Sequence, residues 1–484
     1  MIRSLKFFII IGLGLVTPTT WANGLLLNDE NLRNDLNWLN HQGVIQISTS
    51  TWPLSEEAVI KAIQDANINN KTQQKVIESV LAHVKSQNES FRVNLFAETD
   101  PQYLPQKFGD NIKSQYQVGV QLKSSGENWA GQLKINTEND LIIDHDQKVN
   151  VEGSYLAGKL WNQWIVAGQI PTYWGPGHDG SLIRGDASRP VYGVTLQRAD
   201  QAAFETKWLS WIGPWQYQVF AGQLDDYQAV PNTKLIGMRL TAQPFSYLEL
   251  GLSRVIQWGG KGRPNSLSSL WDAIGGSKDN IDDPNMVATD PANQLAGVDG
   301  RLNLNQWTSI PISFYGQAIG EDEAGGLPSR KLYLAGIDYS SQIKKMPYQL
   351  YAEWSDTRTN GEVKNYTYTH HIYKDGYYQH GFPLGHAMGG DGEMYSLGGD
   401  IRFDAMNRLN GRLMYAKVNQ SALEINQAFL QKDKFKTLDL TWTHYLRPDV
   451  PLKMSGWITD SESLGNNSGI SIGIELPLDA FQFN

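Results

Sequence analysis

The sequence predicts an all-β transmembrane barrel of about 18 antiparallel strands, preceded by a small N-terminal α-helical bundle. Segments with alternating apolar and polar residues recur from Phe91 onward. The connections between them alternate between short and long, as turns and loops do at the two ends of an up-and-down barrel. Asp299 with Arg301, and Asp400 with Arg402, lie two positions apart, so each pair shares a face that we assign to a polar lumen.

The first 22 residues have the pattern of a secretory signal peptide. Arg3 and Lys6 precede the apolar run from Phe7 to Val16, and Thr20-Trp21-Ala22 supplies a small-x-small cleavage site. A membrane anchor is the alternative, but the run is shorter than the ~20 apolar residues of a spanning helix. No later stretch is long and apolar enough for such a helix, which excludes a helical membrane protein and leaves a barrel open.

The amino-acid composition excludes several other classes of protein. The chain of 484 residues has no cysteine, which excludes a disulfide framework and thiol catalysis. Its formal charge of −9 becomes more negative when Arg3 and Lys6 leave with the signal peptide. We therefore expect no nucleic-acid partner.

Residues 23–90 are predicted to form the helical bundle. Three runs show helical features: Leu32, Leu36 and Leu39; Leu54 to Val59, with Ser55 as N-cap before Glu56 and Glu57; and Lys71 to Lys85, with valines at 76, 80 and 84. A bundle this small is marginal alone, so we expect it to pack on the rest of the chain.

Residues 91–484 are predicted to form the barrel. Expected strands lie near 91–98, 114–122, 129–137, 149–159, 164–171, 203–209, 215–223, 235–242, 247–256, 294–304, 311–320, 331–339, 347–355, 394–403, 410–417, 437–445, 452–459 and 468–476. Short connections include 124–128, 160–163, 212–214, 244–246 and 447–451, and long ones include 172–202, 257–293, 356–393 and 418–436. Every long connection follows an odd-numbered strand, so the long loops should share one end of the barrel.

Aromatic residues near strand ends are expected to form girdles at the two membrane interfaces. Trp208, Trp211 and Trp215 surround the Gly213-Pro214 turn, and Trp258 follows Ile256 at the outer end of a strand. The last strand alternates cleanly and is followed by Phe481 and Phe483, but the final residue is Asn484 and not the usual aromatic.

Seven segments spread over nearly the whole mature chain occur in a specific order: 32–39 (LRNDLNWL), 50–55 (STWPLS), 174–184 (WGPGHDGSLIR), 213–217 (GPWQY), 258–264 (WGGKGRP), 369–378 (THHIYKDGYY) and 388–392 (MGGDG). Together they resemble the Wzi family of outer-membrane capsule-assembly proteins. The resemblance implies an 18-stranded barrel whose helical bundle sits at the periplasmic end.

The resemblance also implies a lectin-like protein that attaches and organises capsular polysaccharide on the cell surface, late in capsule assembly, without catalysis or a cofactor. Expected partners are capsular polysaccharide and outer-membrane lipid, with the capsule export machinery as a further candidate and the chain itself as a monomer. A sugar-conducting porin and a polysaccharide- or lipid-modifying hydrolase are the alternatives.

Two long loops hold the candidate carbohydrate-binding residues. Aromatic rings stack on sugar C–H faces, and carboxylates, amides and imidazoles bond hydroxyls. The candidates are Trp174, His178, Asp179, Arg184 and Asp186 in the first loop, and Tyr366, Tyr368, His370, His371, Tyr373, Asp375, Tyr377, Tyr378 and Asp391 in the second. Alternatively, the aromatics pack the second loop as a lid over the barrel mouth, and Arg184 pins a salt-bridged first loop.

Other chemistry in these loops is less well supported. Adjacent His370 and His371 match no zinc pattern, and we expect no metal. A glycosidase needs two carboxylates roughly 5–10 Å apart, a distance that sequence does not supply. The acidic segment from Lys278 to Asp290 lacks EF-hand spacing and is expected to be a solvated loop.

Overall fold

The computed structural model describes residues 24–88, 91–102, 104–143, 147–225, 227–275, 292–321, 329–359, 366–422 and 426–477. The expected signal peptide, the acidic segment from Lys278 to Asp290, and Phe481 and Phe483 lie outside these ranges.

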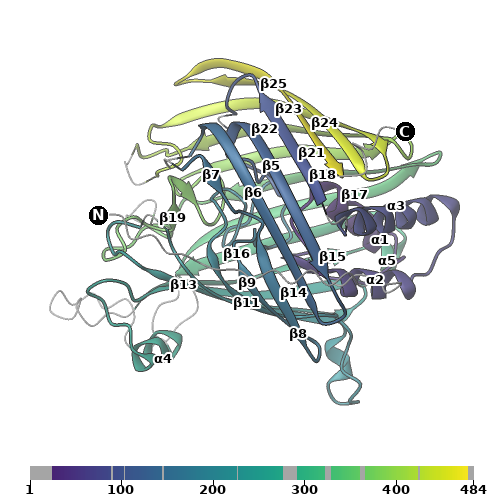
Figure 1. Ribbon diagram of the computed structural model, residues 1–484, viewed down its shortest axis with the longest axis horizontal. Helices are drawn as coiled ribbons and strands as arrows, with labels where there is room; N and C mark the ends of the chain where they lie inside the picture. The colour runs from purple at the N-terminus through teal and green to yellow at the C-terminus, as the bar shows by residue number, and fades with distance from the viewer. Residues whose placement is uncertain are drawn as a thin grey trace.

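The wall is a closed antiparallel barrel of 18 strands, counting β7 and β8 as one interrupted strand (Figure 1). Its strands are β4 (Phe91–Glu98), β5 (Ser114–Ser125), β6 (Trp129–Leu141), β7 (Val149–Asn150), β8 (Tyr155–Leu160), β9 (Gln163–Gly168), β11 (Tyr192–Arg198), β12 (Trp215–Gln223), β13 (Lys234–Phe245), β14 (Leu248–Trp258), β15 (Ala292–Asn303), β16 (Ile312–Glu321), β17 (Ser329–Ile343), β18 (Met346–Asp356), β21 (Glu393–Arg402), β22 (Asn407–Val418), β23 (Asp433–Arg447), β24 (Val450–Ser461) and β25 (Gly465–Pro477). Pairing of β25 with β4, Leu476 opposite Val93, closes the ring. The predicted fold class is confirmed.

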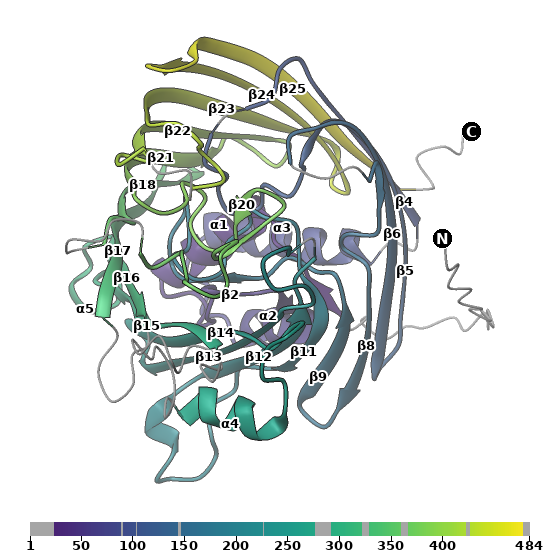
Figure 2. The same ribbon diagram turned by 90° about the vertical axis from the view of Figure 1, so that its left-hand side faces the viewer.

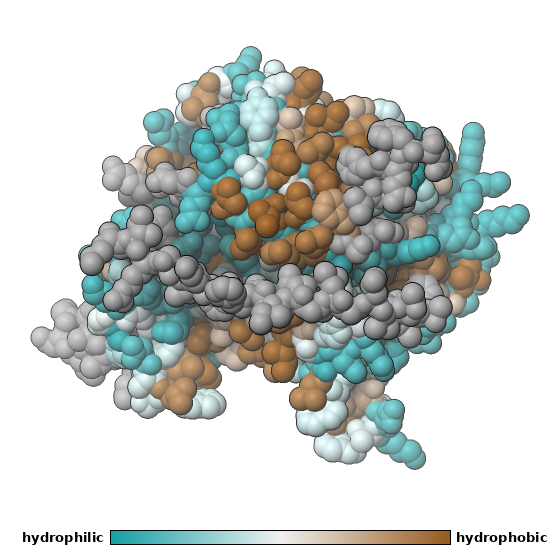
Figure 3. Space-filling view, viewed as in Figure 1, coloured by the Kyte–Doolittle hydropathy of each residue, from teal (hydrophilic) through white to brown (hydrophobic). Residues whose placement is uncertain are grey.

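The wall is apolar outside and polar inside. On β5, Val118 and Val120 are exposed while Gln117 and Gln121 are buried. Figure 3 shows brown, apolar side chains gathered over the strands. This alternation is the reverse of that in a water-soluble sheet and fits an outer surface that faces lipid.

The charged pairs predicted for the lumen do face it. Asp299 accepts a 2.6 Å hydrogen bond from buried Arg239, and Asp400 pairs with Arg408. Isolated charges inside the wall would be costly to bury, so the lumen holds them in pairs.

Three helices precede the barrel: α1 (Glu30–His41), α2 (Glu56–Gln64) and α3 (Lys71–Gln87). The leucines and valines that predicted α1 and α3 are buried in one apolar cluster. Ser55 is the N-cap of α2, as predicted, although its side chain makes no cap hydrogen bond within the described residues. Among the described residues, no helix has the length and apolar character needed to span a bilayer.

The helices fill the short-turn end of the lumen. Viewed down the barrel from the long-loop end, α1, α2 and α3 lie within the ring of strands (Figure 2). The amide of Gln42 bonds Ser340 O at 2.9 Å, near the β17–β18 turn, and Lys123 of β5 pairs with Glu56 of α2 at 2.8 Å. The bundle therefore packs on the wall, as its small size predicted.

The remaining elements are short. They are β1 (Leu25–Leu26), β2 (Thr51–Trp52), β3 (Leu54–Ser55), β10 (Tyr173–Trp174), β19 (Tyr378–Gln379), β20 (Phe382–Pro383), the 3₁₀ turn Ser210–Ile212, α4 (Leu267–Gly275) and α5 (Asn305–Thr308).

Two sequence predictions are wrong. The strand expected at 203–209 is irregular, and the strand that pairs with β9 and β12 is β11, at 192–198. The first long loop therefore ends at residue 191. Residues 199–214 form a long connection at the short-turn end of the barrel. Trp258 is not in a girdle, because it is buried beneath α4, whereas Trp208 and Trp211 are exposed.

Candidate functional site

The loop between β9 and β11, residues 169–191, folds into the lumen. Its β10 pairs antiparallel with β2, so Tyr173 lies opposite Trp52 and Trp174 opposite Thr51. Arg33 of α1 donates to Gly177 O at 2.8 Å and Gly175 O at 3.1 Å. The inserted loop thus rests directly on the helical bundle.

The wall grips this loop at His178 and Asp179. The backbone N–H groups of both residues donate to the Glu353 carboxylate, at 2.7 and 3.1 Å. The His178 ring lies 2.7 Å from Asp338 and stacks on Tyr351 with centroids 4.2 Å apart. Asp179 is fully buried and accepts from Arg412 at 3.2 Å. These contacts fix the loop in the middle of the lumen.

The second predicted loop, residues 366–391, covers the inserted loop as a lid. Its tyrosine hydroxyls satisfy buried carbonyls: Tyr368 donates to Leu182 O at 2.6 Å and Tyr377 to Ile183 O at 2.7 Å. The rings belong to the same buried cluster as Trp174. The aromatic residues therefore pack the lid, which is the alternative that the sequence left open.

Burial separates the predicted binding residues into two groups. Trp174, His178, Asp179, Arg184, Asp186, Tyr368, His370, Tyr373, Tyr377, Tyr378 and Asp391 are all buried. Tyr366, His371 and Asp375 are partly or fully exposed. Among the described residues, Arg184 forms no ion pair with a carboxylate, and its guanidinium lies 5.0 Å from the centre of the Phe220 ring. In this arrangement, only the residues of the second group are accessible to a polymer outside the barrel.

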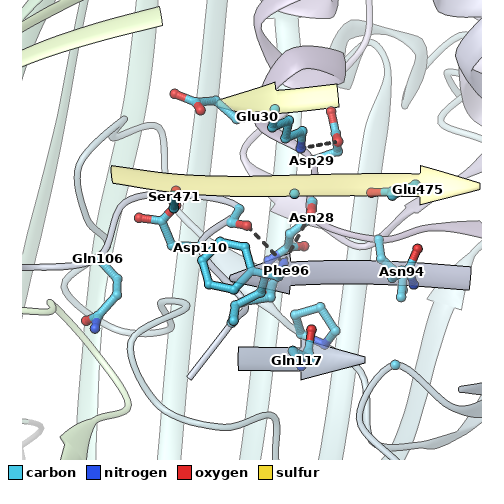
Figure 4. Close-up of a pocket in the computed structure, with 18 of the residues that line it drawn as sticks. Asn28, Asp29, Glu30, Asn94, Phe96, Gln106, Asp110, Gln117, Ser471 and Glu475 are labelled. Carbon is cyan, nitrogen blue, oxygen red and sulfur yellow. Dashed lines mark hydrogen bonds and ion pairs between the residues drawn. The ribbon is translucent and has the colours of Figure 1, made fainter. Parts of the chain in front are cut away.

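A polar cavity of about 360 Å³ remains beside these layers, along the wall formed by β23–β25 and β4–β6. In Figure 4, Glu475 and Ser471 of β25, Asn94 and Phe96 of β4 and Gln117 of β5 face Asn28, Asp29 and Glu30. Its lining extends from α3 to the loop 99–113. Its volume lies in the usual range for small-molecule sites.

Three amide side chains that line this cavity each have one polar atom without a hydrogen-bond partner among the described residues. Within the described residues, Oδ1 of Asn28, Oδ1 of Asn136 and Nε2 of Gln121 make no hydrogen bond, and all three side chains are more than nine-tenths buried. An unsatisfied buried polar group costs about 1–3 kcal/mol. The cavity is therefore suited to water or to a hydroxyl-rich ligand.

Asp186 joins the cavity rim to the inserted loop. Its carboxylate accepts from Asn28 Nδ2 at 2.6 Å and from Gly109 N–H at 2.9 Å. Burial raises the pKa of the Asp186 carboxyl to about 6, although the Gly109 bond and the nearby Lys113 ammonium favour the charged form. Asp186 thus ties together the segment before α1, the loop 99–113 and the inserted loop.

Sequence reasoning missed the residues that hold the loop and line the cavity. Glu353, Asp338 and Arg412 lie on the polar face of their strands, as do Gln117 and Gln121. The alternation that predicted the lumenal face of Asp299 would have identified them too. It would not have shown which ones meet the loop.

The sequence and the fold of this chain match those of known proteins. Residues 85–467 match the family model described as capsule assembly protein Wzi. A Klebsiella pneumoniae protein, described as an uncharacterized 55.8 kDa protein in the cps region, is 44% identical over 99% of this chain and 94% of its own. The solved structure of Escherichia coli Wzi, described as an outer membrane protein involved in group 1 capsule assembly and a carbohydrate-binding β-barrel, is 44% identical. It superposes with a TM-score of 0.88 over 94% of this chain and 99% of its own.

Proposed function

The chain belongs to the Wzi family of capsule assembly proteins, and from this premise we propose that it is an outer-membrane protein that holds capsular polysaccharide on the cell surface without cleaving it. The observation that carries the proposal is the way in which the described parts of two long loops fill the long-loop end of the lumen. Two long loops are bonded to each other there, since Tyr368 and Tyr377 of the lid donate to carbonyls of the inserted loop. The barrel thus presents a surface to a polymer in place of an open channel.

The long-loop end is taken to face outward, with the helical bundle toward the periplasm. Short turns on the periplasmic side and long loops outside are the rule for such barrels, which supports this orientation. The capsule export machinery would then meet the helical end, and outer-membrane lipid would surround the apolar wall. The chain acts as a monomer in this proposal.

The exposed lid residues are the proposed polymer contacts, and the buried ones their scaffold. Tyr366 lies under Arg330, 3.5 Å from guanidinium carbon to ring centre, and Asp375 accepts from the Gln228 and Ala229 N–H groups at 2.6 and 2.8 Å. His371 and Lys374 are exposed beside them. Rings, imidazole and charge on a fixed surface suit a hydroxylated polymer.

Binding to purified capsular polymer tests the proposed surface. The variants His371→Ala and Lys374→Ala should each weaken binding by about 1 kcal/mol, or roughly five-fold in Kd. Lys207→Ala, exposed at the opposite end, should leave binding unchanged and serves as the matched control. If all three variants bound the polymer with equal affinity, the exposed lid residues would not be its binding site.

Deletion of the gene in its host tests the function itself. Cell-bound polysaccharide should fall while released polysaccharide rises, with total polymer maintained. Unchanged bound capsule would contradict the proposal. Incubation of the protein with polymer should leave chain length unaltered, and shortening would favour a hydrolase.

A conducting porin is the second candidate, and the cavity along β4–β6 is the observation that favours it. We expect no steady current from the purified protein in planar bilayers. Steady open-channel current would support conduction in place of polymer holding.

A further inference from the structure

Helix α4 lies outside the barrel wall, near the long-loop end (Figure 2). Ala273 of α4 is buried in a cluster with Ile256 and Trp258 of β14 and Ala292 of β15. Ile256 and Trp258 share a strand face with Leu252, which is exposed on the outer surface. The helix therefore covers the part of the outer wall next to the lipid-facing band.

Polar contacts fix α4 in this position. Arg254, also on the outer face of β14, donates to Ile274 O at 2.7 Å and Ala273 O at 3.1 Å. Gln294 donates to Ala273 O at 2.7 Å, and the Trp258 indole to Ser269 Oγ at 3.2 Å. A cation at the C-terminus satisfies carbonyls that the helix cannot bond itself and complements its dipole. The helix is thus held on the wall by specific hydrogen bonds.

One flank of α4 is apolar and uncovered. Leu267 is 76% exposed and Trp271 is 70% exposed. At 3.6 residues per turn, both lie within about 60° of Ile274 around the helix axis, while Asp272 lies at least about 100° from each of the three. The uncovered apolar flank is therefore continuous with the face that packs on the barrel.

We propose that α4 is an interfacial anchor whose Leu267 and Trp271 insert into the outer-leaflet lipid. Continuity with the lipid-facing wall favours lipid as the occupant, because Leu240, Leu252 and Val298 are exposed on β13, β14 and β15. Tryptophan is enriched at membrane interfaces, and amphipathic helices lie there with the apolar side in lipid. The inference rests on the outer-membrane location and not on polysaccharide binding.

Single-cysteine labelling tests the anchor, because the full chain has no cysteine of its own. Trp271→Cys and, as the control on the polar side of the helix, Asp272→Cys would each carry a polarity-sensitive fluorophore. The protein would be placed in phosphatidylcholine nanodiscs with one chain per disc. Lipids with a nitroxide near the headgroup end of the acyl chain would act as quenchers. Leu267→Cys provides a second position on the apolar flank.

The expected result is blue-shifted emission from positions 271 and 267, with several-fold stronger quenching by the labelled lipid than at position 272. Equal emission and quenching at all three positions would overturn the proposal. The measurement would be repeated in discs that hold two chains. A blue shift at 271 that is found only in those discs would also overturn the proposal, because the occupant would then be a second copy. Circular dichroism and heat-dependent gel mobility confirm that each variant is folded.

Discussion

Arg412 is the residue that fastens the inserted loop to the wall. Its guanidinium lies 3.2 Å from Asp179 of the loop, 3.3 Å from Asp439 of β23 and 3.2 Å from the carbonyl of Pro105. Asp179 is fully buried, so its charge depends on this partner. Removing one partner of a buried pair leaves an uncompensated charge.

The variant Arg412→Met should therefore lower the free energy of unfolding by about 3–5 kcal/mol. Urea titration of the refolded protein in detergent micelles measures this change. Adding Asp179→Asn to the same chain should restore part of the loss, because the unpaired charge is then removed. If the double variant is no more stable than the single one, Arg412 does not act through Asp179.

At the scale of elements, the lid contains two histidines whose neutral forms fit their surroundings. Ile372 and Tyr373 N–H groups donate to His370 Nδ1 at 3.2 and 3.3 Å, and Met388 N–H donates to His386 Nδ1 at 3.3 Å. Burial lowers the pKa of His370 to about 3 and that of His386 to about 4. Protonation would turn each Nδ1 acceptor into a donor that faces other donors.

The lid should therefore loosen in acid. A histidine whose folded pKa is lowered contributes stability that is complete above about pH 6.5 and is lost as pH falls toward the folded values. At pH 5 the loss amounts to about 2 kcal/mol for each histidine. Hydrogen exchange of residues 366–391, corrected for intrinsic rates, should rise between pH 7 and pH 5.

An asparagine at each position provides the control for this prediction. The amide oxygen of His370→Asn and His386→Asn can accept from the same backbone N–H groups, as asparagine does in Asx turns, but it does not titrate. The double variant should lose the pH dependence of lid exchange. Unchanged dependence would place the titrating groups elsewhere.

The strands show what alternation can and cannot predict. Residues with apolar side chains facing lipid, such as Val118 and Val120 of β5, reveal a strand without any knowledge of its neighbours. β11 has the same alternation, with Tyr192, Val194 and Leu196 facing outward and Thr195 and Gln197 inward, but it has only seven residues and directly follows the inserted loop. The region 203–209 contains apolar residues such as Phe204 and Trp208, but it is an irregular connection in the structure.

The candidate site shows a different limit. Tyr368 and Tyr377 were predicted to contact sugar because their rings and hydroxyls suit it. In the structure the same hydroxyls bond Leu182 and Ile183 carbonyls. Both uses require the same residue type, and only the path of the inserted loop decides between them. Sequence placed the two loops at one end but could not show that one covers the other.

At the scale of the whole molecule, the lumen is filled by three connected layers. Arg33 joins the helical bundle to the inserted loop, and the lid tyrosines join that loop to the outer surface. The bundle is also tied to the wall at Asp35, which accepts from Arg402 at 2.6 Å and Arg408 at 3.0 Å. Closure thus combines these polar contacts with apolar packing, because Phe220, Val255 and Leu295 of the wall belong to the same buried cluster as the lid tyrosines.

The variant Asp35→Asn should release α1 while the barrel stays folded, because it weakens two charged contacts without altering the strand pairing. Arg33 is 2% exposed, so trypsin should cut there only when α1 leaves the lumen. We expect faster cleavage after Arg33 and unchanged heat-dependent gel mobility, which reports the intact barrel. Glu78→Gln, on the exposed face of α3, is the matched control and should leave both measurements unchanged. If Asp35→Asn instead abolishes the folded gel band, the bundle is needed to keep the barrel closed, and the two parts unfold as one unit.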